Sequence, residues 1–148
     1  MRKINEYISD YFENIVYDKT QNEDCFFSLT INNIYSFESK GELDFGGSEY
    51  IKSKFKKINP EKKDEDDKYG WWFLDEGIYK ARLNEKVKKI NESITLIIEP
   101  HKRLLDCGVT HNTEIITNKG KIEVFLQVGE NGVNIKENAR ISTVKVFK

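Results

Sequence analysis

The stretch from Glu99 to Gly120 gathers the residue types that are best suited to chemistry in this chain. It reads EPHKRLLDCGVTHNTEIITNKG, and it contains both histidines of the sequence and two glycines. A basic cluster, His101-Lys102-Arg103, stands near its start. Cationic side chains and freed backbone amides bind phosphate and other anions well. We therefore expect these three residues to hold an anion, although a solvated turn between strands explains the same cluster equally well.

Other chemistry in this stretch is less specific. Glu99, Asp106 and Glu114 could serve acid–base catalysis, but any acidic protein offers such groups. The two histidines lie ten residues apart without an HExxH motif, and nothing pairs Cys107 with His111 as a nucleophile and its base. The chain has no GxxxxGK[ST] or GxGxxG phosphate loop. We expect no metal site formed by the protein alone, and the basic cluster is the more informative signal.

Strand-like segments flank this stretch on both sides. Residues 93–98 are rich in β-branched side chains, and residues 121–128 alternate between polar and apolar side chains. Polar clusters held between rigid strands are where binding and catalysis usually occur. Several more short alternating segments, joined by turns, precede and follow them. The pattern predicts an all-β sandwich, jelly roll or barrel.

Two segments outside the strands have distinct patterns. Apolar residues between Ile4 and Val16 recur at spacings of three and one, which predicts an amphipathic helix over residues 3–17 that packs on the sheet. Residues 52–68, KSKFKKINPEKKDEDDK, form a charge run of mixed sign that is broken by Pro60, and this predicts a solvated loop.

The bulk composition excludes several classes of protein. The 148 residues fit a single domain over residues 1–148, and 24 basic against 25 acidic residues argue against a protein that wraps duplex nucleic acid. No apolar run approaches the roughly 20 residues that span a bilayer. The two cysteines lack metal-type spacing, which favours reduced thiols in a cytoplasmic protein. We expect neither a membrane nor duplex nucleic acid as a partner.

Four segments, in the same order along the chain, resemble the motifs of one family. SLTINNIY at residues 28–35 is similar to Asp-Leu-x-Val-Gly followed by an aromatic or apolar pair, and residues 72–87 are similar to W-x-L-x-P-G-x-Y…N-E-x-V. EPHKRLLDCGV at residues 99–109 is similar to Pro-Arg-Ser-Ser-Leu-x-Arg-x-Gly-Val. IKENARISTVKVF at residues 135–147 is similar to K-N-A-R-I-x-Q-L-V-F. The chain thus resembles the trimeric dUTPase and dCTP deaminase superfamily from about residue 24 to its end.

The chain departs from the family's motifs at functional positions. Ser28 stands where the first motif has Asp, and His101-Lys102-Arg103 replace Arg-Ser-Ser. Thr117 stands near the position of the acid that activates water. Hydrolysis between the α and β phosphates needs a positioned base and a metal clamp, so these losses predict loss of catalysis. Asp106 stands where the motif at residues 99–109 has its later Arg, and Thr143 stands where the last motif has Gln.

The resemblance implies a mainly β fold, the β-clip or distorted jelly roll, with the N-terminal helix added. It also implies a homotrimer whose ligand sites lie between subunits. Our first hypothesis is a catalytically silent dUTPase-like protein, a pseudoenzyme that binds or sequesters a nucleotide or another phosphorylated small molecule without a cofactor. His101, Lys102 and Arg103 then supply charge, and the residues that read the base or sugar are Asn112, Thr113 and Glu114.

Two alternatives stay open from the sequence. The first is an active dUTP diphosphatase or dCTP deaminase with rearranged residues, which would use Mg²⁺ and Glu114 as its acid–base group. The second is a trimeric scaffold or regulator that binds a protein partner through residues 52–68. The sequence leaves open whether the chain serves a host or a phage or other mobile element.

Overall fold

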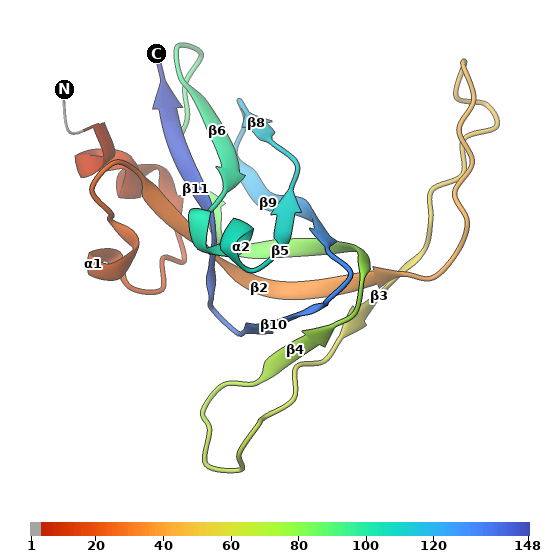
Figure 1. Ribbon diagram of the computed structural model, residues 1–148. Coiled ribbons are helices and arrows are strands. Elements are labelled where there is room, and N and C mark those ends of the chain that lie inside the picture. Colours follow the sequence, from red (N-terminus) through yellow and green to blue (C-terminus); the bar gives the residue numbers. More distant parts are fainter. Residues whose placement is uncertain (1–3) are drawn as a thin grey trace.

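The computed structural model describes residues 4–148 (Figure 1). A 3-10 helix, η1 (Ile4–Tyr11), and two short α-helices, α1 (Asp18–Gln21) and α2 (Lys102–Asp106), accompany a chain that is otherwise mostly strand. The strands are β1 (Phe12–Glu13), β2 (Phe27–Phe37), β3 (Phe55–Ile58), β4 (Trp71–Leu74), β5 (Gly77–Val87), β6 (Thr95–Pro100), β7 (Val109–His111), β8 (Glu114–Ile116), β9 (Gly120–Val128), β10 (Val133–Lys136) and β11 (Arg140–Phe147).

The main sheet curls until its two ends meet. Its strand order is β7-β9-β5-β2-β11-β6-β8, with β1 paired to β5 and β3 paired to β2. All of its pairs are antiparallel. The first and last strands of this path, β7 and β8, are linked in sequence by only Asn112 and Thr113. A link that short requires the sheet to close on itself, so the predicted mainly β, distorted jelly-roll architecture of the β-clip is confirmed.

The predicted amphipathic helix over residues 3–17 forms only in part, and residue 3 lies outside the described residues. The segment forms the 3-10 helix η1 only to Tyr11, and Phe12 and Glu13 then pair with β5 as strand β1. Asn14 follows with a φ of 66°, a left-handed conformation that ends any helix. The apolar spacing nevertheless identified residues that reach the core, since Ile8 and Phe12 are both buried.

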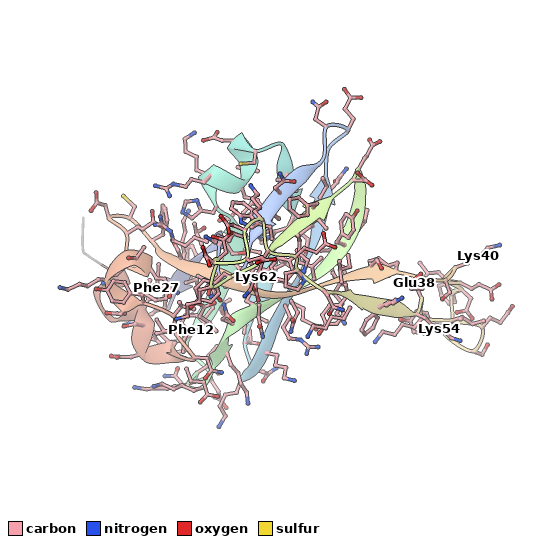
Figure 2. All side chains as sticks on the ribbon, turned by 90° about the horizontal axis from the view of Figure 1, so that it is seen from below. Phe12, Phe27, Glu38, Lys40, Lys54 and Lys62 are labelled. Atoms are coloured by element: carbon pink, nitrogen blue, oxygen red, sulfur yellow. The ribbon has the colours of Figure 1, made fainter. Side chains whose placement is uncertain are left out.

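The predicted charged loop at residues 52–68 is only partly a loop. Phe55–Ile58 form β3, which pairs with β2 from Phe37 to Ile34. The segment that leads from β2 to β3, residues 38–54, is an arm that projects from the body of the protein (Figures 1 and 2). Most of the remainder of the charge run is exposed, as expected, and Lys63 lies 3.7 Å above the ring of Trp71.

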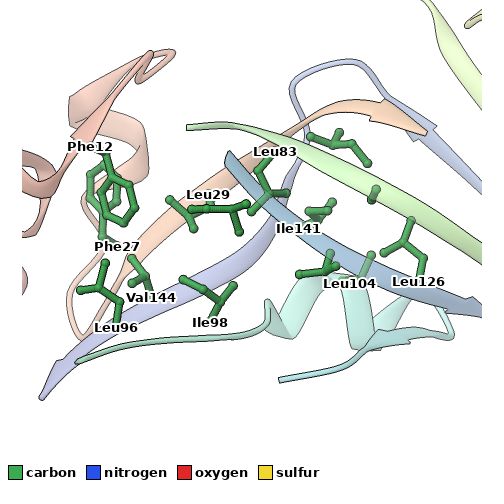
Figure 3. Packing of buried hydrophobic residues seen from close by; sticks show 14 of the residues in the cluster. Phe12, Phe27, Leu29, Leu83, Leu96, Ile98, Leu104, Leu126, Ile141 and Val144 are labelled. Carbon is green, nitrogen blue, oxygen red and sulfur yellow. The ribbon is translucent and has the colours of Figure 1, made fainter. Parts of the chain in front are cut away.

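A single hydrophobic core fills the inside of the curled sheet (Figure 3). Phe12 stacks on Phe27 with ring centroids 6.2 Å apart, so the N-terminal segment is attached through an aromatic contact. Trp72 is buried within its own chain, and its indole donates to the carbonyl of Ile58 at 2.8 Å. Within residues 4–148, no helix is long and apolar enough to cross a membrane.

Candidate functional site

A charged cluster occupies the end of the sheet where β2, β6 and β11 meet. The carboxylate of Glu23, in the loop before β2, accepts a hydrogen bond from the hydroxyl of Ser28. The same oxygen lies 2.9 Å from Nε2 of His101 and 3.2 Å from Nη1 of Arg140. We call Glu23, Ser28, His101 and Arg140 the Glu23 cluster. It joins the first, third and last of the motif segments that the sequence singled out.

The proton of His101 can be assigned from its hydrogen bonds. Its Nδ1 accepts from the backbone amide of Arg103 at 3.0 Å, so this nitrogen carries no proton. Nε2 therefore donates to Glu23. The side chain of His101 is buried, with its ring edge-on to Phe26 at 5.5 Å. His101 thus holds Glu23 and caps helix α2, and its two ring nitrogens are both used within the chain.

The carboxyl of Glu23 is held in its ionised form. Partial burial raises the pKa of Glu23, but hydrogen bonds from Ser28 and His101 and the positive charge of Arg140 outweigh burial, and the pKa falls below its usual value. A carboxylate of this kind is a weak proton acceptor and a good anionic ligand. The arrangement suits positioning better than proton transfer.

A cavity of about 450 Å³ lies beside the Glu23 cluster. Its basic lining residues are Arg103, Lys136 and Arg140, and none of the residues that line it is acidic. Trp71 and Tyr17 contribute aromatic surface. A cavity of this size, with three cations and two aromatic rings, can hold an anionic ligand that carries a planar group.

The three residues of the predicted basic cluster lie in different environments. His101 is buried against Glu23, whereas the side chain of Lys102 is 81% exposed and lies 3.3 Å from Asp106. Arg103 alone of the three lines the cavity. Helix α2 separates Lys102 from Arg103, because consecutive residues on a helix point in directions about 100° apart, and His101 precedes the helix as its N-cap. Of the predicted anion-binding residues, Arg103 is therefore the best placed.

The other three predicted ligand residues form a second group at the seam of the sheet. Asn112 donates to the carboxylate of Glu114 at 2.8 Å and accepts from the backbone amide of Phe125 at 2.8 Å. Thr113 is exposed between them, and Glu114 pairs with Ile98 of β6. Within one chain, Asn112 and Glu114 thus bond to each other, to β9 and to β6, whereas His101 bonds to Glu23.

His111 is a structural residue of the interior. Its Nδ1 lies 2.6 Å from the carbonyl of Asn112 and its Nε2 lies 2.8 Å from the hydroxyl of Ser142. Burial lowers the pKa of His111, and the bond to the Asn112 carbonyl offsets only part of that effect. A neutral ring therefore donates from Nδ1 and accepts from Ser142, which ties β7 to β11 across the barrel.

Sequence reasoning missed Glu23, Arg140 and Lys136 as site residues. Arg140 lies inside a motif that resembled the family, so its identity carried a signal. Glu23 lies in a polar turn, and the sequence has no periodicity that would direct it toward Ser28 five residues later. Its role depends on a loop that folds back on β2.

Comparison with known proteins finds several relatives that carry the same name. No family model matches the chain. A probable deoxyuridine 5′-triphosphate nucleotidohydrolase of Methanosarcina mazei is 34% identical over 144 residues, covering 95% of this chain and 80% of that protein. A protein of the same name from Methanosarcina acetivorans is 33% identical over the same shares of both chains. One from Archaeoglobus fulgidus is 29% identical over 83% of this chain.

A solved structure agrees on the fold. The chain resembles the 2′-deoxycytidine 5′-triphosphate deaminase of Agrobacterium tumefaciens with a TM-score of 0.66, at 9% identity over 95% of this chain. It spans 44% of that longer chain. The fold, the motif order and the level of identity to the Methanosarcina proteins agree, and together they show that this chain belongs to the dUTPase and dCTP deaminase superfamily.

Proposed function

We propose that this chain binds a deoxynucleoside triphosphate and hydrolyses it between the α and β phosphates, with Glu23 supplying the carboxylate that Ser28 lacks. The observation that carries this proposal is the hydrogen bond from the Ser28 hydroxyl to the Glu23 carboxylate. The family's first motif has Asp where this chain has Ser28, and the carboxylate beside that position in this chain comes from Glu23. Relatives named as probable nucleotidohydrolases support turnover over silent binding.

The proposed roles follow from charge and placement. Arg103 and Arg140 bind the phosphates at the wall of the cavity, where guanidinium groups can make paired hydrogen bonds to phosphate oxygens. Arg140 is held in place by Glu23 and by the carbonyl of Thr20, 3.3 Å from its Nη1. Tyr17 and Trp71 offer surface for the base or the sugar.

Glu23 is the one carboxylate of the cluster that could meet a magnesium ion arriving with the nucleotide. Mg²⁺ is usually held by one or two carboxylates together with substrate phosphates. Among the described residues, no group of three or more His, Cys, Asp or Glu side chains could hold a metal by itself. Glu23 would hold the ion with the phosphate oxygens, and the ion would neutralise phosphate charge.

The proposed assembly is a homotrimer in the cytoplasm. The family resemblance implies sites between subunits, which would bring Asn112, Thr113 and Glu114 of one subunit toward the cavity of the next. Glu114 is then the candidate proton acceptor for the attacking water. Cys25 and Cys107 are free thiols, which agrees with a reducing compartment.

The test is turnover of dUTP and dCTP with Mg²⁺, followed by chromatography of the products. We expect dUMP and pyrophosphate from dUTP. In Glu23→Gln we expect kcat to fall at least about 100-fold, because misplacing the reacting groups commonly costs that much. Glu13→Gln is the matched control, since Glu13 pairs only loosely with Lys86 at 3.7 Å, away from the cluster. Unchanged turnover in Glu23→Gln would refute the role of Glu23.

A silent nucleotide binder is the second candidate. Ser28 and Thr117 stand where the family's motifs carry acids, which favours a site that binds without catalysis. In that case dUTP shifts the melting temperature and is recovered intact. We expect Arg103→Ala to weaken binding about 10-fold or more under either function, because it removes a charge-assisted bond. Lys102 does not line the cavity, so Lys102→Ala should change the dissociation constant by less than about 3-fold.

A further inference from the structure

The indole ring of Trp71 carries two lysine side chains from separate segments of the chain. The Nζ of Lys63 lies 3.7 Å from the centre of the ring, and the Nζ of Lys136 lies 5.6 Å from it. Both distances are within the range at which an aromatic ring attracts a cation. The distance between the two ammonium groups is at most the sum of these two distances, so a polyphosphate can contact both.

The backbone fixes both lysines beside this ring. Lys136 of β10 is the cross-strand partner of Trp71 on β4. Lys63 belongs to residues 59–70, which connect β3 to β4 (Figure 1). This connection is closed at its base, because Glu61 and Trp71 exchange two backbone hydrogen bonds, at 2.8 and 2.7 Å. Lys63 is therefore two residues from a fixed point, and only its side chain needs to move to meet a ligand.

No carboxylate neutralises these two lysines. In the part of the chain that the structure describes, neither Lys63 nor Lys136 takes part in an ion pair. The neighbouring acids bond to backbone amides instead. Glu137 accepts from the amide of Gly70 at 2.7 Å, and Asp64 accepts from an amide of its own loop at 3.2 Å. Two like charges at one ring repel each other, and an anion bound between them removes that repulsion.

The lysine pair adjoins the cavity of the candidate site. Trp71 and Lys136 both line that cavity, as do Arg103 and Arg140. Arg140 is paired with Glu23, 3.2 Å away, whereas Arg103 has no ion pair among the described residues. Positive charge is thus partly compensated at Arg140 and uncompensated near Trp71, so the cavity favours the more highly charged end of an anionic ligand on the side of Trp71.

We infer that Lys63 and Lys136 bind the terminal phosphate of the nucleotide and make the site selective for triphosphates over monophosphates. Trp71 holds both ammonium groups until the phosphate arrives, and Lys63, which does not itself line the cavity, then turns from the ring to the ligand. Lysine binds phosphate as a point charge, so this turn needs no exact geometry. The inference rests on the proposed function, because it assigns the distal end of the same substrate.

The same assignment accounts for release of the product. A monophosphate lacks the terminal phosphate, so it keeps only the contacts to Arg103 and Arg140 and loses those to the lysine pair. Each lost charge-assisted contact weakens binding, and the monophosphate therefore dissociates more readily than the triphosphate.

The test measures dissociation constants for dUTP, dUMP and inorganic tripolyphosphate by titration calorimetry, on the full chain with EDTA in place of Mg²⁺. We expect Lys63→Met and Lys136→Met each to weaken binding of dUTP and of tripolyphosphate about 10-fold, because each removes a charge-assisted contact. Both should change dUMP binding by less than about 3-fold. Lys63→Arg keeps the charge and should keep most of the affinity. Lys62→Met is the matched control, since Lys62 is the exposed neighbour of Lys63 and contacts none of the described aromatic rings.

Several outcomes would overturn the inference. These are an equal loss of dUTP and dUMP affinity, a loss no greater than that of Lys62→Met, tripolyphosphate that does not compete with dUTP, and a wild type that binds neither ligand. Circular dichroism checks folding, and if Lys136→Met does not fold, the variants of the exposed Lys63 still decide the matter. Turnover of dUTP with an unchanged preference for triphosphate in the lysine variants would contradict this inference alone. Lysine-dependent binding of dUTP without turnover would contradict only the proposed function.

Discussion

Glu85 on β5 accepts two hydrogen bonds from Thr30 on β2, one from the backbone amide at 2.8 Å and one from the hydroxyl at 2.6 Å. The side-chain amide of Gln21 donates a third, at 2.7 Å. The carboxylate is fully buried. Burial raises the pKa of Glu85, and the bonds from Thr30 and Gln21 offset only part of that effect. This network fastens the loop that carries Glu23 to the centre of the sheet.

We expect Glu85→Ala to lower the free energy of unfolding by about 3 kcal/mol or more, because it leaves donors of Thr30 and Gln21 buried without an acceptor. Urea unfolding measures it. Lys86 is at the next position, exposed and loosely paired with Glu13. Lys86→Ala should therefore change the free energy of unfolding by less than about 0.5 kcal/mol. Equal effects of the two substitutions would show that the network contributes little.

The burial of His111 gives the protein a defined dependence on pH. Its pKa is lower in the folded state than its ordinary value of 6.5, so protonation favours the unfolded chain. The stabilisation from the neutral ring is therefore present above about pH 6.5 and is lost as the pH falls below it. Melting temperatures between about pH 7.5 and 5 should fall in the wild type and fall less steeply in His111→Gln. Parallel curves would contradict this assignment.

The contact between Phe12 and Phe27 attaches the N-terminal segment to the core. Phe12→Ala should cost about 3 kcal/mol of unfolding free energy, since it opens a cavity beneath a fully buried ring. Val16→Ala, four residues later and 47% exposed, should cost less than about 0.5 kcal/mol. A small effect of Phe12→Ala would mean that this segment is dispensable for the fold.

Gly132 is required by its backbone conformation. Its φ is 71°, and a Cβ there would lie 2.6 Å from the carbonyl oxygen of Leu74. We expect Gly132→Ala to destabilise the protein by more than about 1 kcal/mol. Gly46→Ala, where a Cβ meets nothing within 4 Å, serves as the control in the same thermal measurement. Similar melting temperatures of the two variants would contradict the strain at Gly132.

The sequence by itself determined the class of the fold and most of the strands. The alternation over residues 121–128 and 139–147 predicted β9 and β11 to within one residue, because a half-buried strand must alternate its side chains. The order of four short motifs determined the superfamily. Both signals are local, and neither needs contacts between distant residues.

Tertiary structure decided the remainder. Strand β2 continues through a bulge at Asn32, because β5 pairs with Ile31 on one side of it and with Asn33 on the other. The turn at residues 129–132 forms, but β9 pairs with β5 and β10 pairs with β4, so no hairpin results.

The candidate site shows the same division. Arg103 could be nominated from its type, whereas Glu23 required the loop to fold back on Ser28 and Arg140. Contacts between residues 23, 101 and 140 span most of the chain and are set by the closure of the sheet, and no local pattern encodes them.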